Sequence, residues 1–211
     1  MKKTRVRFTS GNLLLEGILA IPEDSGPFPA VIVCHPHPLY GGSMDNNVVS
    51  TLSETLTQAS FVSLKFNFRG VGESQGEFSH GIGEQDDVEA AISFISTVKE
   101  IDSKRIGLAG YSAGAAFALP VVFDDARIKA LAAVSLPLSM FSLDFLKGCC
   151  KPKFFISGSR DDLAPTEQFR RFCQNLPEPK ECEIIEGADH FWWGYECHLA
   201  AKVTAFFTKV L

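Results

Sequence analysis

The chain has 211 residues, of which 45% are hydrophobic and 21% are charged, and its formal net charge is -5 at pH 7. This length supports one sizeable core and is short for two, so we expect a single domain over residues 1–211. The negative charge gives no reason to expect nucleic acid or an anionic membrane as a partner. The longest apolar runs fall far short of the roughly 20 residues that cross a bilayer, and the first residues lack the apolar segment of a secretion signal, which predicts a cytoplasmic protein.

Strand-like and helix-like patterns alternate from the first residues onward. Segments 5–10 and 14–21 flank the turn dipeptide Gly11-Asn12 with partly alternating apolar and polar residues, which predicts an antiparallel hairpin. The apolar run AVIVC at residues 30–34 is typical of a strand buried on both faces. The patterns then predict, in order, a helix with Val48, Leu52 and Leu56 on one face, a strand at 61–68, a helix at 84–99, a strand at 105–110, a helix at 112–123, strands at 130–135 and 153–157, a helix at 166–175, a strand at 181–185 and a helix at 195–210.

This order of elements predicts an α/β fold. An antiparallel opening followed by repeated β-α units implies a mostly parallel central sheet with helices on both faces. In such sheets the chemistry lies at the carboxyl ends of the strands. The residues that follow each strand are therefore the candidates for a functional site.

The strand predicted at 105–110 runs into Gly110-Tyr111-Ser112-Ala113-Gly114, directly before an alanine-rich helix. A G-x-S-x-G sequence at such a junction is typical of a nucleophile elbow, a strained turn that lifts the serine hydroxyl clear of the sheet. The two glycines let strand and helix approach closely, and the amide of Ala113 then lies at a helix N-terminus, where it can stabilise an oxyanion. We predict that Ser112 is a nucleophile and that Ala113 supplies one oxyanion-hole amide, with a purely structural turn as the alternative.

The last two predicted strands are followed by an aspartate and a histidine. A serine needs a base to act as a nucleophile near neutral pH, and the base needs a carboxylate to fix its tautomer. Asp161 in SGSRDDLAP and His190 in EGADHFWW supply these groups in the order Ser, Asp, His, the order found in elbow-type hydrolases. Asp162 competes with Asp161, which we favour from its spacing to Gly158 and Pro165, and the other aspartate is expected to cap the next turn.

Two further stretches, CHPHPLYGGSMDN and FNFRGVGESQGEF, occur together with GYSAG, GSRDD and GADHF in one order along nearly the whole chain. Together these motifs resemble the α/β-hydrolase superfamily, and within it the small lidless hydrolases similar to dienelactone hydrolase. The resemblance implies a fold of about eight strands without a cap domain, a triad of Ser112, Asp161 and His190, and hydrolysis through an acyl-enzyme. Dienelactone hydrolases use a cysteine nucleophile where this chain has Ser112, and this difference favours a general ester as substrate.

The loop after residue 34 is the place where elbow hydrolases hold their second oxyanion-hole amide. Pro36 and Pro38 have no amide hydrogen, which leaves the amides of His37, Leu39 and Tyr40. Leu39 and the two residues after it resemble the stretch that carries this amide in dienelactone hydrolases. We therefore choose Leu39, with His37 as the alternative.

Other motifs predict neither a metal nor a cofactor. His35 and His37 could bind a metal with Asp45, but no third histidine or cysteine stands nearby. The glycine-rich segment 70–76 departs from the dinucleotide fingerprint because its third glycine comes one residue late and no helix follows promptly. Arg69, just before it, is expected to make a structural ion pair. The six cysteines lack CxxC spacing, so we expect buried thiols with no disulfide and no zinc site.

Only residues 136–152 separate the strands predicted at 130–135 and 153–157, which is too short for the helical cap that many relatives insert there. An open cleft follows, better suited to short acyl esters or thioesters than to long lipids. We expect the following substrate-binding residues along it: His37, Tyr40, Leu136, Leu138, Met140, Phe141, Leu163 and Trp192.

These observations predict a serine esterase of the carboxylesterase kind, acting on a small-molecule ester as a monomer or homodimer. The alternatives are a thioesterase, a lactone or dienelactone-type hydrolase or a peptide hydrolase with the same triad. A non-catalytic protein that binds a small ligand in the same cleft is the remaining alternative, because a fold alone does not determine a function.

Overall fold

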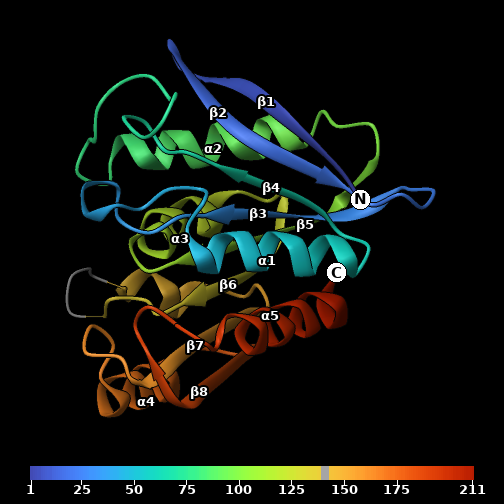
Figure 1. Ribbon diagram of the computed structural model, residues 1–211. Helices are drawn as coiled ribbons and strands as arrows, with labels where there is room; N and C mark the ends of the chain where they lie inside the picture. Colours follow the sequence, from blue (N-terminus) through green and yellow to red (C-terminus); the bar gives the residue numbers. More distant parts are fainter. Residues whose placement is uncertain (139–142) are drawn as a thin grey trace.

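A computed structural model describes residues 1–138 and 143–211 of the chain. Within these residues eight strands form one sheet, in the order β1-β2-β4-β3-β5-β6-β7-β8 (Figure 1). β1 and β2 pair as an antiparallel hairpin and β2 joins β4 in antiparallel fashion, while all later pairs are parallel. The strands are β1 (Lys2–Ser10), β2 (Leu13–Ile21), β3 (Phe28–Cys34), β4 (Val62–Phe66), β5 (Ile101–Tyr111), β6 (Ile128–Val134), β7 (Lys153–Arg160) and β8 (Lys180–Asp189).

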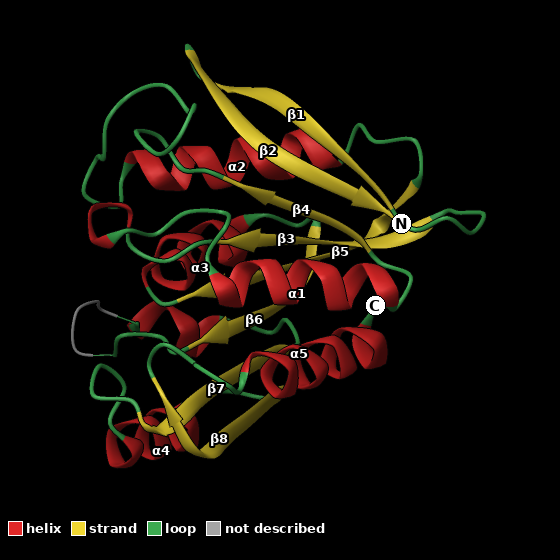
Figure 2. Cartoon of the chain, in the orientation of Figure 1, coloured by secondary structure: helices red, strands yellow, loops and turns green. Residues whose placement is uncertain are grey.

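Helices cover both faces of this sheet (Figure 2). The helices are α1 (Asn47–Gln58), α2 (Gly83–Ile95), α3 (Ala113–Asp124), α4 (Thr166–Asn175) and α5 (Glu196–Val210), with short 3-10 turns at η1 (Pro38–Tyr40) and η2 (Asp144–Gly148). Side chains of β3 alternate between the two faces: Val31 and Val33 pack with α1 and α5, whereas Ile32 and Cys34 pack with α2 and α3. This alternation explains why the run AVIVC is apolar throughout.

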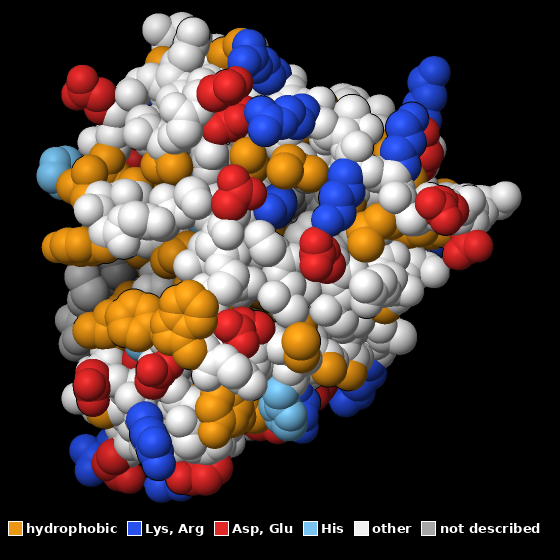
Figure 3. Space-filling model, viewed as in Figure 1, with side chains coloured by type: hydrophobic (Ala, Val, Ile, Leu, Met, Phe, Trp, Pro, Cys, Tyr) orange, Lys and Arg blue, Asp and Glu red, His pale blue; other side chains and the backbone are white. Residues whose placement is uncertain are grey.

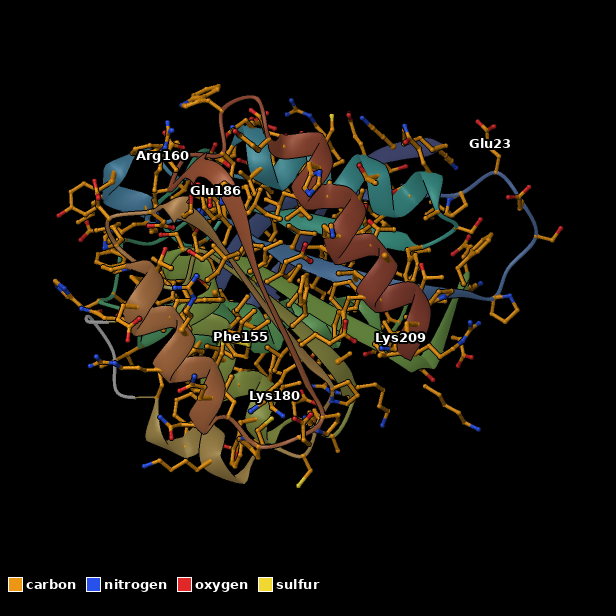
Figure 4. The ribbon with its side chains drawn as sticks, turned by 90° about the horizontal axis from the view of Figure 1, so that it is seen from below. Glu23, Phe155, Arg160, Lys180, Glu186 and Lys209 are labelled. Carbon is orange, nitrogen blue, oxygen red and sulfur yellow. A yellow bond between two sulfur atoms is a disulfide. The ribbon has the colours of Figure 1, made fainter. Side chains whose placement is uncertain are left out.

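The mostly parallel sheet with helices on both faces, as expected from the sequence, is confirmed. β7 and β8 extend to Arg160 and Asp189, beyond the predicted ends at 157 and 185, so Asp161 and His190 directly follow their strands. Figure 4 labels Phe155 and Arg160 of β7. Arg160 is the last residue of the strand, where the next loop begins. In the described part of the β6–β7 connection the only regular element is η2, and no cap domain covers this end of the sheet.

The expectation of no disulfide is wrong, because Cys173 of α4 and Cys182 of β8 are bonded to each other. The two cysteines are nine residues apart, and the connection between α4 and β8 brings their Cα atoms to 6.3 Å, within the usual range for a bridge. The other thiols are free: Cys34 and Cys149 are buried, as expected, whereas Cys150 and Cys197 are exposed. Among the described residues, no helix has the length and apolarity to span a lipid bilayer.

Candidate active site

Ser112 lies in the turn between β5 and α3, with a backbone conformation that few side-chain-bearing residues adopt. Its φ of 54° and ψ of -124° fall in a sparsely populated region, a strain that clusters at functional sites. Glycines on both sides allow the turn to close: a Cβ atom on Gly110 would overlap the backbone of Ala115, and one on Gly114 would overlap the carbonyl oxygen of His35. The turn places the Ser112 hydroxyl at the end of the sheet, in front of the loop that follows β8.

Ser112, His190 and Asp161 are joined by hydrogen bonds, although they come from three separate strand ends. The Ser112 Oγ lies 3.0 Å from the Nε2 of His190. The Nδ1 of His190 lies 2.9 Å and 3.0 Å from the two carboxylate oxygens of Asp161. An Nδ1–H that donates to the carboxylate leaves Nε2 free to accept the serine proton, so this arrangement can generate a nucleophile.

The Asp161 carboxylate is buried and accepts several hydrogen bonds. Oδ1 accepts the backbone N–H groups of Leu163 at 3.0 Å and Ala164 at 3.1 Å. Burial alone would raise its pKa, but hydrogen bonds and charge from His190, together with donors from Ser135 and Leu163, hold the pKa below its ordinary value. Asp161 therefore stays ionised beside the imidazole. Asp162, the competing candidate, is exposed and has no bond to His190.

Residues that the sequence analysis missed hold the histidine loop in place. The phenol of Tyr111, inside the elbow motif, donates to the backbone carbonyl of His190 at 2.7 Å. Burial, with the charges of Asp161 and Asp189, raises the Tyr111 pKa, so this hydroxyl remains a donor. Asn47, at the start of α1, donates to the carbonyl of Phe191 at 3.2 Å.

Trp192 does not line the cleft, so that expectation is wrong. Its side chain is fully buried in the core on the α1 and α5 face, and its indole N–H donates to the Ser135 hydroxyl at 3.0 Å. Its neighbour Phe191 faces the cleft instead. Three successive aromatic residues in a loop carry no periodicity, so the sequence could not indicate which of them turns inward.

The loop between β3 and α1 places His37 rather than Leu39 in the cleft beside Ser112. The N–H of Leu39 donates to the Nδ1 of His37 within the η1 turn, its side chain is exposed, and it does not line the cleft, so the choice of Leu39 as oxyanion-hole donor is contradicted. His37 does line the cleft, and no hydrogen bond within the described residues uses its N–H or that of Ala113. Tyr40 is excluded because its N–H donates to the carbonyl of His37.

His35 has a structural role in the same loop. Its Nδ1 bonds the carbonyl of Pro36 at 2.6 Å, and its Nε2 accepts the N–H of Phe68 at 3.1 Å. Burial lowers its pKa to about 4, so the ring is neutral at pH 7. Both ring nitrogens are therefore already in use, which argues against the metal-binding alternative for this histidine.

The cleft beside Ser112 has a volume of about 460 Å³. His37, Tyr40 and Leu163 line it, as expected from the sequence. Leu136 is buried in the core and Leu138 packs against that core, so neither lines the cleft, while Met140 and Phe141 lie outside the described residues. The lining residues are Pro36, His37, Tyr40, Gly41, Gly42, Asn46, Tyr111, Ser112, Ala113, Pro137, Leu163, His190 and Phe191.

The charged cluster near the glycine-rich segment 70–76 lies apart from this cleft. Arg69 forms a two-pronged ion pair with the fully buried Asp87, including a 2.7 Å bond from Nη2 to Oδ1. Glu84, in the first turn of α2, accepts the N–H groups of Ser79 and Gly81. These side chains fix the loop before α2, in agreement with the structural role expected for Arg69.

Comparisons with known proteins identify the family and support the fold. Residues 30–196 match the family described as "Alpha/beta hydrolase domain". An uncharacterised protein of Rickettsia prowazekii is 33% identical over 172 residues, which cover 78% of this chain and 72% of that protein. A solved structure described as an alpha-beta serine hydrolase homologue from Coxiella burnetii superposes with a TM-score of 0.89 at 31% identity, covering 97% of both chains. A putative alpha/beta hydrolase from Agrobacterium tumefaciens has a TM-score of 0.87 at 28% identity, covering 99% of this chain and 95% of that one. The chain therefore belongs to the alpha/beta hydrolase domain family and is a member of the alpha/beta-hydrolase superfamily.

Proposed function

We propose that this hydrolase is a serine esterase that cleaves small esters through an acyl-enzyme. The observation that carries the proposal is the continuous set of hydrogen bonds from Asp161 through His190 to the Ser112 hydroxyl. This geometry meets the requirement for an activated serine, since nucleophile, base and orienting carboxylate are each within hydrogen-bond reach of the next.

In the first half of the reaction, His190 Nε2 accepts the Ser112 proton as Oγ attacks the ester carbonyl. The carbonyl oxygen becomes an oxyanion, and we assign its two donors to the backbone N–H groups of Ala113 and His37, which line the cleft and have no other acceptor among the described residues. The imidazolium, stabilised by ionised Asp161, then protonates the departing alkoxide, which leaves as the alcohol and gives the acyl-enzyme.

In the second half, His190 accepts a proton from water, and the hydroxide attacks the acyl-enzyme carbonyl. The same amides hold the second oxyanion. Ser112 leaves with the proton returned by His190, and the carboxylic acid is released.

Labelling with a fluorophosphonate tests this proposal directly. The reagent is expected to modify Ser112 of the wild-type protein and to leave Ser112→Ala unlabelled. A panel of p-nitrophenyl esters, thioesters and lactones then identifies the preferred bond. Absence of both labelling and turnover in the wild-type protein contradicts an enzymatic role, whereas labelling with a preference for thioesters or lactones reassigns the substrate class.

A further inference from the structure

The described part of the chain exposes few large apolar side chains, and three of them surround the mouth of the cleft. Tyr40 is 85% exposed, Phe191 59% and Leu163 45%, and all three also line the cavity beside Ser112. We call these three residues the apolar rim. Hydrophobic side chains gather along the side of the molecule onto which the carboxyl ends of β3 and β5 open, the left side in Figure 3. Exposed apolar surface that continues a cavity is typical of a binding site.

The backbone of each rim residue is fixed by hydrogen bonds. The N–H of Tyr40 donates to the carbonyl of His37 at 3.1 Å, and the N–H of Leu163 donates to Asp161 at 3.0 Å. Phe191 is held on both sides, because its N–H donates to Asp189 at 2.9 Å and its carbonyl accepts from Asn47. These side chains are therefore presented to solvent by ordered loops, and binding an apolar group would not require the loops to become ordered first.

The charge of the cavity restricts what it can bind. None of its lining residues within the described part of the chain is Asp, Glu, Lys or Arg. Burial lowers the pKa of His37, which favours its neutral form. A carboxylate on the substrate would lose hydration here without meeting a cation, which is unfavourable. The site therefore favours neutral molecules.

We propose that the apolar rim binds a ring or an aliphatic chain of a neutral ester, and that Tyr40 and Phe191 determine specificity for that group. The inference rests on the proposed esterase function. A cavity of about 460 Å³ lies within the range that holds drug-sized ligands and exceeds the needs of an acetyl group. The rim then extends the site outward, so that substrates larger than the shortest esters gain contacts that an acetate ester cannot make.

The test compares kcat/KM along two ester series, one with acetyl, hexanoyl and benzoyl groups on p-nitrophenol, and one with methyl and hexyl alcohols on a common acid. In the wild-type protein, kcat/KM for a larger apolar ester should exceed kcat/KM for the smallest ester by about tenfold or more in at least one series. Phe191→Ala and Tyr40→Ala should each reduce that ratio by about threefold or more. Ile82→Ala is the matched control, because Ile82 is 74% exposed but does not line the cavity. Ratios that are unchanged in both rim variants, across both series, overturn the proposal.

A pair of esters matched in acyl-chain length but different in charge tests the preference for neutral substrates. The p-nitrophenyl ester of butyric acid should exceed the p-nitrophenyl monoester of succinic acid by about tenfold or more in kcat/KM, and equal rates contradict the inference. Analytical ultracentrifugation of the rim variants provides a further check. A change in oligomeric state would indicate that the apolar rim is a contact between copies of the protein rather than a substrate site. Fluorophosphonate labelling of Ser112 in every variant separates failure of this inference from failure of the esterase proposal.

Discussion

The indole of Trp192 donates a 3.0 Å hydrogen bond to the hydroxyl of Ser135, a group that helps to hold the pKa of Asp161 below its ordinary value. Because an indole N–H can only donate, it uses an acceptor position of the Ser135 hydroxyl and leaves the hydroxyl proton available for Asp161. Ser135 lies directly after β6 and is fully buried, with a φ of 48°. A buried tryptophan thus positions the aspartate that orients His190.

The first prediction concerns this contact. Trp192→Phe keeps an aromatic ring in the core but removes the indole donor, so kcat for small esters should fall by about three- to tenfold while KM changes little. The adjacent Trp193→Phe is the matched control, because Trp193 is 69% exposed, and it should leave kcat within about twofold. Steady-state kinetics and the NMR signal of the His190 Nδ1 proton provide the readouts. Equal kcat values for the two variants contradict a positioning role.

The second prediction separates the two neighbouring aspartates. Asp161→Asn replaces the carboxylate that bonds Nδ1 of His190, so kcat should fall by roughly 10² to 10⁴. Asp162→Asn changes an exposed side chain and should alter kcat by less than about tenfold. The measurement is kcat with a p-nitrophenyl ester, alongside the midpoint of urea unfolding to show that both variants are folded. The opposite order of effects would move the triad carboxylate to Asp162.

The third prediction tests the backbone amide of His37. The residue has a φ of -54°, close to the value that proline imposes, so His37→Pro can remove the N–H without reorienting the chain. His37→Ala removes the ring but retains the amide. The proline variant should be slower than the alanine variant by on the order of 10² in kcat, since an oxyanion-hole donor is lost only there. Similar rates for the pair would return the assignment to another amide of this loop.

The fourth prediction follows from the buried His35 ring. Its pKa is about 4 in the folded chain against an ordinary value of 6.5, so between these values the unfolded chain binds a proton that the folded chain does not. The free energy of unfolding should therefore decrease as the pH falls through this window, by about 3 kcal/mol in all from this group. In urea titrations at several pH values, His35→Asn should be less stable than the wild-type protein at pH 7 but should lose less stability on acidification. His198→Gln, at an exposed position, should retain the wild-type pH dependence.

Local patterns in the sequence were sufficient to predict the elements and the triad candidates. Strands buried on both faces leave continuous apolar runs, and a serine between glycines at a strand end reflects a turn that few other sequences can form. The helix predicted at 166–175 coincides with α4, and the triad candidates follow the ends of β5, β7 and β8. These features depend on neighbouring residues, which is why they could be predicted.

The features that could not be predicted depend on how particular side chains and amides pack and bond in the folded chain. The burial of Trp192 is linked to a hydroxyl 57 positions earlier, at Ser135. The Cys173–Cys182 bridge depends on how α4 lies against β8, and the choice between His37 and Leu39 depends on which amide the η1 turn uses internally. None of these relationships leaves a periodic or compositional signal. The family resemblance indicated this loop but not that the N–H of Leu39 donates to the His37 ring within it.

The bond between Tyr111 and the His190 carbonyl also affects local opening of the protein. β8 is the last strand of the described sheet, with β7 as its neighbour, and edge strands open at lower free energy than central ones. Tyr111 belongs to the central strand β5, so its hydrogen bond connects the backbone of His190 to the middle of the sheet as well as to the edge strand β8. In hydrogen–deuterium exchange, amides near Lys180 should therefore exchange well before those of Phe191 and Trp192. Local unfolding at this edge should leave the hydrogen bond between His190 and Ser112 intact.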